Sequence, residues 1–147
     1  MQPPNDRVLA ALDRLATAAV GVTALALAET AAARDLTLAQ WRALVVISSS
    51  DGLRAGEVAA RIGMSRPSMS RLVRRLERRG VIAVAEDPND GRATILRATP
   101  AGDAMRIATM ARRRTLMAEA VAARREPLPK SLADALDAVA DALERHG

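Results

Sequence analysis

The sequence predicts a mainly helical fold in which a helix-turn-helix is followed by a β-hairpin, with long helices at both ends of the chain. Apolar residues recur at helical spacing through most of the 147 residues. A glycine-containing break at residues 63–64 separates two short helices, and turn residues at 87–92 divide two β-compatible runs. The length suits one domain, and an apolar content of 50% is enough to build a core.

The first predicted element is a long helix over residues 6–33, a segment rich in Ala and Leu and free of proline. Its small residues would let another helix approach closely, so it either meets a partner or packs as an ordinary buried helix. Between Arg14 and Glu29 lie 14 uncharged residues, fewer than the ~20 that span a bilayer. Residues 1–6 lack the basic side chain of a signal peptide. We therefore expect no membrane partner and a cytoplasmic location.

A second helix is predicted to begin after Thr37, because Thr37 and Gln40 have the spacing of a capping box. Trp41 and Leu44 then fall on one face, and Ser, Asp and Gly residues at 48–52 end the helix. Trp41 is most simply a core residue. The alternative is that it lines a pocket for a small-molecule effector.

The helix-turn-helix follows from the capping residues of two short segments. Residues 55–62 form a helix that Gly63 closes as a left-handed C-cap. Ser65 is a favourable N-cap, and Pro67 is tolerated in the first turn of the next helix. That helix runs to residue 79 and stops at Gly80, so two short helices are joined by a tight turn.

The second of these helices has one apolar face and one basic face. At about 100° per residue, four apolar residues share one side: Met69, Leu72, Val73 and Leu76. Across residues 54–79, eight arginines stand against Glu57 and Glu77, whereas an ordinary solvated face would mix the signs. Phe and Tyr are absent, which argues against stacking on single strands. We predict a duplex-DNA-binding surface that contains Ser65, Arg66, Ser68, Ser70, Arg71, Arg74 and Arg75.

The runs at 81–86 and 93–99 predict a β-hairpin directly after the basic helix, which makes the unit a winged helix. Arg92 lies near the tip, where a planar cation can enter a minor groove. Asp90 could brace Arg92 in the free protein. The alternative is a plain turn with an arginine that binds nothing.

Two helices complete the chain. Thr99 and Pro100 start a helix that continues to about residue 125, before two prolines interrupt the chain. Ser131 is predicted to cap the last helix, whose apolar stripe has nothing left to cover within one winged helix; its residues are Leu132, Leu136, Val139 and Leu143. We expect a single domain, 1–147, with a DNA-binding part at 37–99 and dimerisation helices at 6–33 and 100–147.

Composition excludes most catalytic and metal chemistry. Cysteine is absent, and the single histidine, His146, lies beside the C-terminus. A cysteine nucleophile, a thiolate metal site or a Ser/His/Asp triad therefore has no support. We expect no enzyme, no metal and no cofactor. The alternative function from another class is a winged-helix module that binds an acidic partner protein.

The order of these elements resembles the MarR family of bacterial transcription regulators over nearly the whole chain. The motifs that carry the resemblance are Leu38–Leu44, Glu57–Gly63, Ser65–Gly80, Asp87–Arg92, Thr99 and Gly102. Ala98 departs from the pattern, since the family often has Leu before the threonine. The resemblance implies a homodimer that binds pseudo-palindromic operators, commonly as a repressor released by an anionic or aromatic small molecule.

Overall fold

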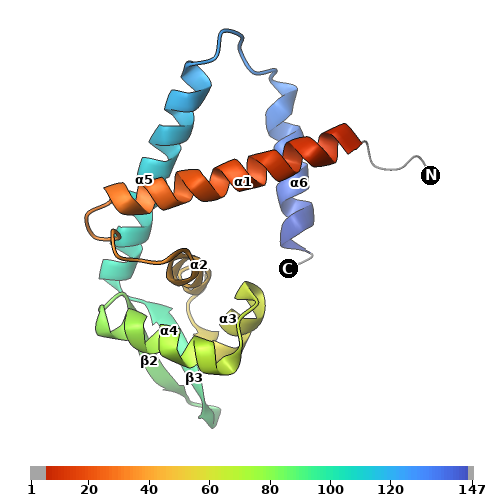
Figure 1. Cartoon of the computed structure of the whole chain (residues 1–147). Helices are drawn as coiled ribbons and strands as arrows, with labels where there is room; N and C mark the ends of the chain where they lie inside the picture. Colours follow the sequence, from red (N-terminus) through yellow and green to blue (C-terminus); the bar gives the residue numbers. More distant parts are fainter. Residues whose placement is uncertain (1–5, 146–147) are drawn as a thin grey trace, which may run out of the picture. The chain divides into compact units, whose positions relative to one another are not determined.

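The computed structural model describes residues 6–145, so His146 lies outside the described part of the chain. One compact unit ends at Met117 and a second begins at Ala118. The elements follow one another as in Figure 1: α1 (Asp6–Glu29), α2 (Leu38–Ile47), β1 (Leu53–Arg54), α3 (Ala55–Ile62), α4 (Arg66–Arg78), β2 (Ile82–Asp87), β3 (Asp90–Ala98), α5 (Pro100–Ala122) and α6 (Ser131–Glu144). The mainly helical winged helix-turn-helix expected from the sequence is confirmed.

The core of the first unit is formed by α2, the helix-turn-helix and the sheet. Its largest fully buried side chains come from five different elements and from one position between α4 and β2: Leu44, Ile47, Val58, Leu76, Val81, Leu96 and Thr109. Trp41 is also buried, as a core residue at the start of α2 would be. Because these side chains come from elements that are distant in sequence, their packing in one core fixes the position of α4 relative to the hairpin.

The helix boundaries of the helix-turn-helix are those that the capping residues predict. Gly63 has φ 66° and ψ 38°, in the left-handed region. The hydroxyl of Ser65 accepts the N–H of Ser68 at the start of α4. Thr37 and Gln40 form the complete capping box before α2.

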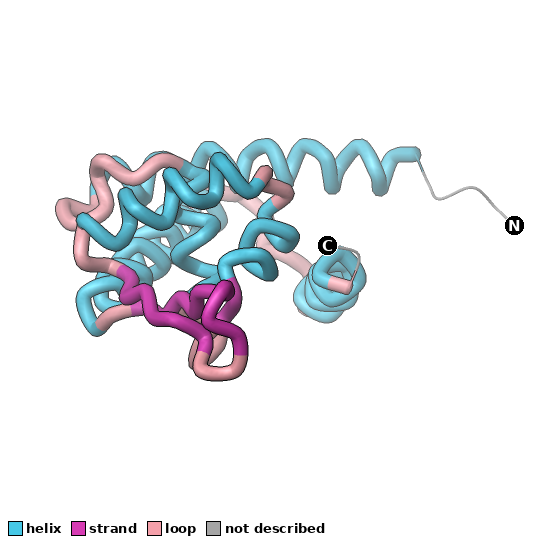
Figure 2. The backbone as a smooth tube through the Cα atoms, turned by 90° about the horizontal axis from the view of Figure 1, so that it is seen from below, coloured by secondary structure: helices cyan, strands magenta, loops and turns pink. Residues whose placement is uncertain are grey.

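The sheet has three antiparallel strands in the order β1-β3-β2. The third strand, β1, was missed in the sequence because it is only two residues long; it pairs Leu53 with Leu96 and Arg54 with Ile95. Figure 2 shows the hairpin of β2 and β3 projecting from the helices. The turn is also tighter than the six residues expected, since Asp87 pairs with Asp90 across Pro88 and Asn89. The Asp87 carboxylate accepts the N–H of Asn89 and so closes the turn locally.

The first helix ends four residues earlier than predicted. The hydroxyl of Thr30 donates to the carbonyl of Ala26, and a chain of tight turns continues to Leu36. Glu29, the last residue of α1, accepts from Arg112 of α5 at 2.5 Å. The N-terminal helix and α5 therefore pack together within the first unit.

The helix α6 is described within the second unit. The expectation that Ser131 caps it is wrong: Lys130 occupies the N-cap position in helical geometry, and no side chain caps the helix. Since residue 130 is already helical, Ser131 lies inside the first turn. No residue of α6 is buried, so the described part of the second unit does not itself cover its apolar stripe.

Among the described helices, α1 is long and apolar enough to cross a membrane by length and composition alone. The count of 14 uncharged residues did not include its whole 24-residue length. Only three of its residues are buried: Thr23, Ala26 and Leu27. An apolar helix that packs on another protein surface passes the same test.

Candidate nucleic-acid interface

The helix α4 separates its apolar and basic residues onto opposite faces. Met69, Leu72 and Leu76 are at most 6% exposed and hold the helix on the core. The arginines of the other face are exposed: Arg66, Arg71, Arg74, Arg75 and Arg78. None of these five forms an ion pair among the described residues. Their charges are therefore directed to solvent and remain available to an anionic partner.

Three polar side chains form a chain of hydrogen bonds at the start of α4. The Ser65 hydroxyl lies 3.1 Å from the hydroxyl of Ser68, and the Arg71 guanidinium donates to Ser68 at 3.4 Å. Ser68 is half-buried, whereas Ser65 and Ser70 are exposed. The first turn of a helix also presents backbone N–H groups and a partial positive charge, which favour a phosphate at this end.

A groove of about 810 Å³ lies between α3, α4 and the hairpin. It brings together five of the residues predicted from the sequence, from two separate segments: Arg66, Ser70 and Arg74 of α4, and Asp90 and Arg92 of the wing. The N-cap Ser65 and the other predicted residues of α4, namely Ser68, Arg71 and Arg75, do not line it. Arg66 and Arg74 of α4 thus share one concave face with the wing arginine, Arg92.

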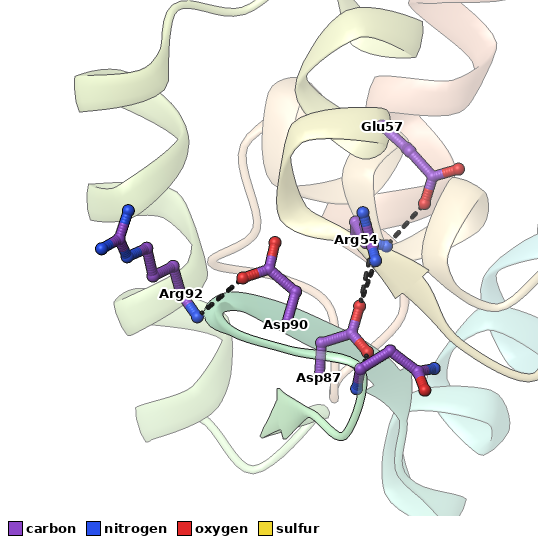
Figure 3. Close-up of polar contacts among 6 residues, drawn as sticks. Arg54, Glu57, Asp87, Asp90 and Arg92 are labelled. Atoms are coloured by element: carbon purple, nitrogen blue, oxygen red, sulfur yellow. Dashed lines mark hydrogen bonds and ion pairs between the residues drawn. The ribbon is translucent and has the colours of Figure 1, made fainter.

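The contact between Asp90 and Arg92 involves the backbone. The Asp90 carboxylate accepts the backbone N–H of Arg92 at 3.1 Å. In Figure 3 the guanidinium of Arg92 points away from that carboxylate. Asp90 therefore shapes the wing tip while the cationic end of Arg92 stays exposed.

A second set of polar contacts connects the wing to α3 and was not identified from the sequence. Arg54 donates to the Asp87 carboxylate through Nε at 2.8 Å and through a terminal nitrogen at 2.6 Å. Asp87 is buried, although it carries a charge. The N–H of Asn89 lowers the pKa of Asp87 most, and Arg54 lowers it further against the opposing effect of burial. The sequence does show a charged residue, Asp87, at the end of a predicted strand. Its partner, Arg54, lies 33 positions away in the chain, so the pair could not be recognised from the sequence.

Trp41 lies at a different site. It lines a cavity of about 510 Å³ with residues of α1, α2, α3 and α5. The lining is mainly apolar and includes two cationic side chains, Arg42 and Arg113. Trp41 is thus both a buried core residue and part of a cavity wall.

Comparisons with known proteins agree with this geometry. A crystal structure of RV1404 from Mycobacterium tuberculosis matches with a TM-score of 0.75 at 21% identity, covering 100% of this chain and 97% of that one. A transcriptional regulator (MarR family) from Rhodococcus sp. RHA1 matches with a TM-score of 0.74 at 23% identity, covering 98% and 96%. Streptococcus pneumoniae FabT in complex with DNA matches with a TM-score of 0.74 at 15% identity, covering 97% and 99%. These likenesses show the fold.

The family follows from a match in sequence. Residues 34–93, which contain the whole helix-turn-helix and most of the wing, match the model of the MarR family. Over residues 34–93 the chain has the sequence of the MarR family. A comparison with curated protein sequences gives no match. The matched segment is the winged helix-turn-helix that MarR-family transcriptional regulators share.

Proposed function

We propose that this MarR-family regulator acts as a homodimeric repressor on a pseudo-palindromic duplex operator in the cytoplasm. The observation that carries the proposal is the exposed cationic face of α4, which no described acidic side chain neutralises. Such a face releases counterions from a phosphate backbone when it binds. The groove lined by α4 and the wing gives this charge a shape that a duplex can occupy.

In the proposed complex, α4 enters a major groove. Arg66, Ser68, Ser70, Arg71 and Arg74 lie nearest base edges and phosphates, while Ser65 and the first N–H groups of the helix hold a phosphate. Arg75 stands on the same exposed face and contacts the backbone. Arg92 enters the flanking minor groove, and Asp90 braces the tip through the backbone of Arg92.

The homodimer is supported by apolar surface that the chain itself leaves uncovered. Large apolar side chains on α1, α5 and α6 are exposed, among them Leu15, Val20, Ile107, Val121 and Leu143. Exposed patches of this kind mark protein-protein contacts. We assign residues 37–99 to DNA binding and 6–33 and 100–147 to dimerisation, within one domain over 1–147. A two-fold axis then places two α4 helices about one turn of DNA apart.

Binding is tested by measuring affinity at increasing salt for a 40-bp duplex that the wild-type protein enriches from a random pool. On logarithmic axes, the association constant should fall steeply as the salt concentration rises. Arg74→Ala should reduce the magnitude of that slope by about 1 if Arg74 contacts a phosphate. Arg71→Ala should cost ~1–3 kcal/mol and relax preference at one base pair if Arg71 reads a guanine.

The matched control is Arg34→Ala, which removes an exposed arginine outside α4 and the wing and should leave the slope unchanged. A flat salt dependence for the wild-type protein would contradict the proposed function. Capture of an acidic protein by a chain that ignores every duplex would instead support the protein-interaction alternative.

The proposed effector site is the cavity at Trp41. Its apolar walls and the two arginines suit an apolar organic anion, because a guanidinium pairs with a carboxylate in a largely apolar site. Trp41 is the single tryptophan, so its fluorescence reports on this cavity directly. Benzoate should change that fluorescence in a saturable way and weaken DNA binding, and Arg113→Gln should raise the benzoate concentration required. No saturable response, or a response unaffected by Arg113→Gln, would refute this assignment.

A further inference from the structure

An arginine stands where the helix α3 would favour a capping residue. Arg54 precedes α3 with extended backbone angles, φ −65° and ψ 141°, and its side chain makes no capping hydrogen bond. Ser, Thr, Asp and Asn are preferred at this position because their oxygens accept the free N–H groups of the first turn. A guanidinium has no acceptor and cannot do this. This end of α3 therefore lacks a side-chain cap, and the Arg54 side chain is available for another contact.

That contact is the ion pair with Asp87 of the wing. Both Nε and a terminal nitrogen of Arg54 donate to the same carboxylate oxygen, at 2.8 and 2.6 Å. The other oxygen accepts the N–H of Asn89 at 2.9 Å. Asp87 has 4% of its side chain exposed, so loss of its cationic partner would leave a buried charge without compensation.

The backbone of Arg54 is fixed on the opposite side. Its N–H donates to the Glu57 carboxylate at 2.8 Å, within the first turn of α3. Figure 3 shows the resulting series of contacts, which runs from Glu57 through Arg54 to Asp87 at the base of the turn. The start of α3 and the end of β2 are thus joined by side chains.

Strand pairing alone does not hold the wing tip in place. The pairing of β1 ends at Arg54 and Ile95, and Ile95 lies three residues after Arg92 in the chain. Beyond that point β3 pairs with β2 only, and the register shifts between Glu86 and Asp87. An isolated two-stranded ribbon is marginally stable in water. The tip therefore depends on the contact between Arg54 and Asp87.

We propose that Arg54 is a positioning residue for the wing: its ion pair with Asp87 sets where Arg92 stands relative to α4, and thereby the minor-groove contact. This inference rests on the proposed duplex binding. Arg54, Arg66, Arg74 and Arg92 line the same groove, so a small rotation of the tip changes the spacing of the cations that a duplex must meet. Pairing with Asp87 also neutralises Arg54, which distinguishes it from the free arginines of α4.

The test is a double-mutant cycle on the 40-bp duplex enriched by the wild-type protein. Arg92→Ala and Arg54→Gln should each weaken binding on the order of tenfold, the loss expected for one specific arginine contact. The double variant should bind no more weakly than Arg92→Ala alone, because a positioning residue has no effect once the residue it positions is gone. Equal losses from Arg54→Gln in both backgrounds would overturn the proposal and make Arg54 a direct phosphate contact.

Two further variants separate positioning from charge and from folding. Arg61→Gln removes one exposed arginine from α3, the helix that Arg54 precedes, and its effect should be the same with or without Arg92. Arg54→Lys keeps the charge but not the double donation, and should restore part of the affinity. Thermal unfolding of each variant confirms that the proteins compared are folded.

A measurement without DNA tests the anchor independently of the proposed function. Nuclear spin relaxation of the backbone amides of Arg92 and Ala93 should show lower order parameters in Arg54→Gln and Asp87→Asn than in the wild-type protein. Unchanged order at the tip would overturn the proposal. If the wild-type protein binds no duplex, the proposed function fails, and the relaxation data still decide whether Arg54 orders the wing.

Discussion

Gly102 in the first turn of α5 is the position where a single methyl group should do most damage. A Cβ built there would lie 2.0 Å from the carbonyl oxygen of Val81 and 3.3 Å from Leu44 Cδ1. The carbonyl cannot swing away freely, because it accepts the N–H of Thr99 at 3.1 Å. The Thr99 hydroxyl in turn donates to the carbonyl of Gly80 at 2.6 Å and accepts the N–H of Gly102 at 3.1 Å.

The substitution Gly102→Ala must therefore separate two backbone segments by about 1 Å to reach even the shortest tolerable contact of 3.0 Å. Overpacking of this kind costs ~1–3 kcal/mol. Strain in two of the junction hydrogen bonds adds ~1 kcal/mol each, and the better helix propensity of Ala returns ~1 kcal/mol. The net loss is about 2–4 kcal/mol, which for a chain of this size lowers Tm by about 10 °C.

The measurement is thermal unfolding followed by circular dichroism, with all variants at the same protein concentration because a dimer's Tm depends on it. Gly56→Ala is the matched control: this glycine is also in the first turn of a helix, but its Cβ would meet nothing within 4 Å. It should leave Tm unchanged or raise it. A Tm for Gly102→Ala within about 1 °C of the wild-type value would refute the reasoning.

Four further predictions follow from local geometry. Glu29→Gln should cost less than ~1 kcal/mol in urea unfolding, because both partners of its ion pair with Arg112 are about one-third exposed, and a loss above ~2 kcal/mol would contradict a surface pair. The pKa of Asp87 is lowered, so its contribution to stability is present above about pH 3.9, the unfolded value, and is lost as pH falls through the folded pKa. The Asn89 amide resonance should therefore titrate with a midpoint below about pH 3.9. A midpoint above that value would mean that Asp87 destabilises the folded state instead. Leu143→Asp should shift the protein toward monomer in sedimentation equilibrium, whereas Asp137→Asn on the same helix should not, and an unchanged dimer would exclude Leu143 from the interface. Gly63→Ala places a Cβ at φ 66° and should cost ~1–2 kcal/mol, with Gly63→Asn costing less; equal stability of all three would show that the left-handed cap carries no strain.

The helices were predictable because their ends depend on residues within four positions. The Thr37–Gln40 box, the Ser65 cap and the Gly63 turn each act through hydrogen bonds inside one turn of chain. Where such a signal was weak, the boundary moved. The helix α1 ended at Glu29, and Ser131 failed as a cap because the chain before it was already helical.

Part of the interface could be predicted as well. The opposite faces of α4 follow from a fixed angle per residue, so the exposure of Arg71, Arg74 and Arg75 and the burial of Leu72 were available from the sequence. Arg92 was expected at the hairpin tip, and it is the third residue of β3, two positions past Asp90. The groove that joins it to Arg66 and Arg74 could not be derived, because the tilt of a hairpin against a helix depends on the whole core.

By itself, the sequence determined the order of the helices and the hairpin, the caps at Thr37, Gly63 and Ser65, and the side of α4 that carries charge. Only the tertiary structure decided that Arg54 contacts Asp87, that a two-residue strand joins the sheet, and that Gly102 touches Val81. The first group of properties arises from interactions between residues that are close in the chain, so a given local sequence pattern produces them wherever it occurs. The second group requires segments that are distant along the chain to meet in one register, and that register is set by how all the core side chains pack at once.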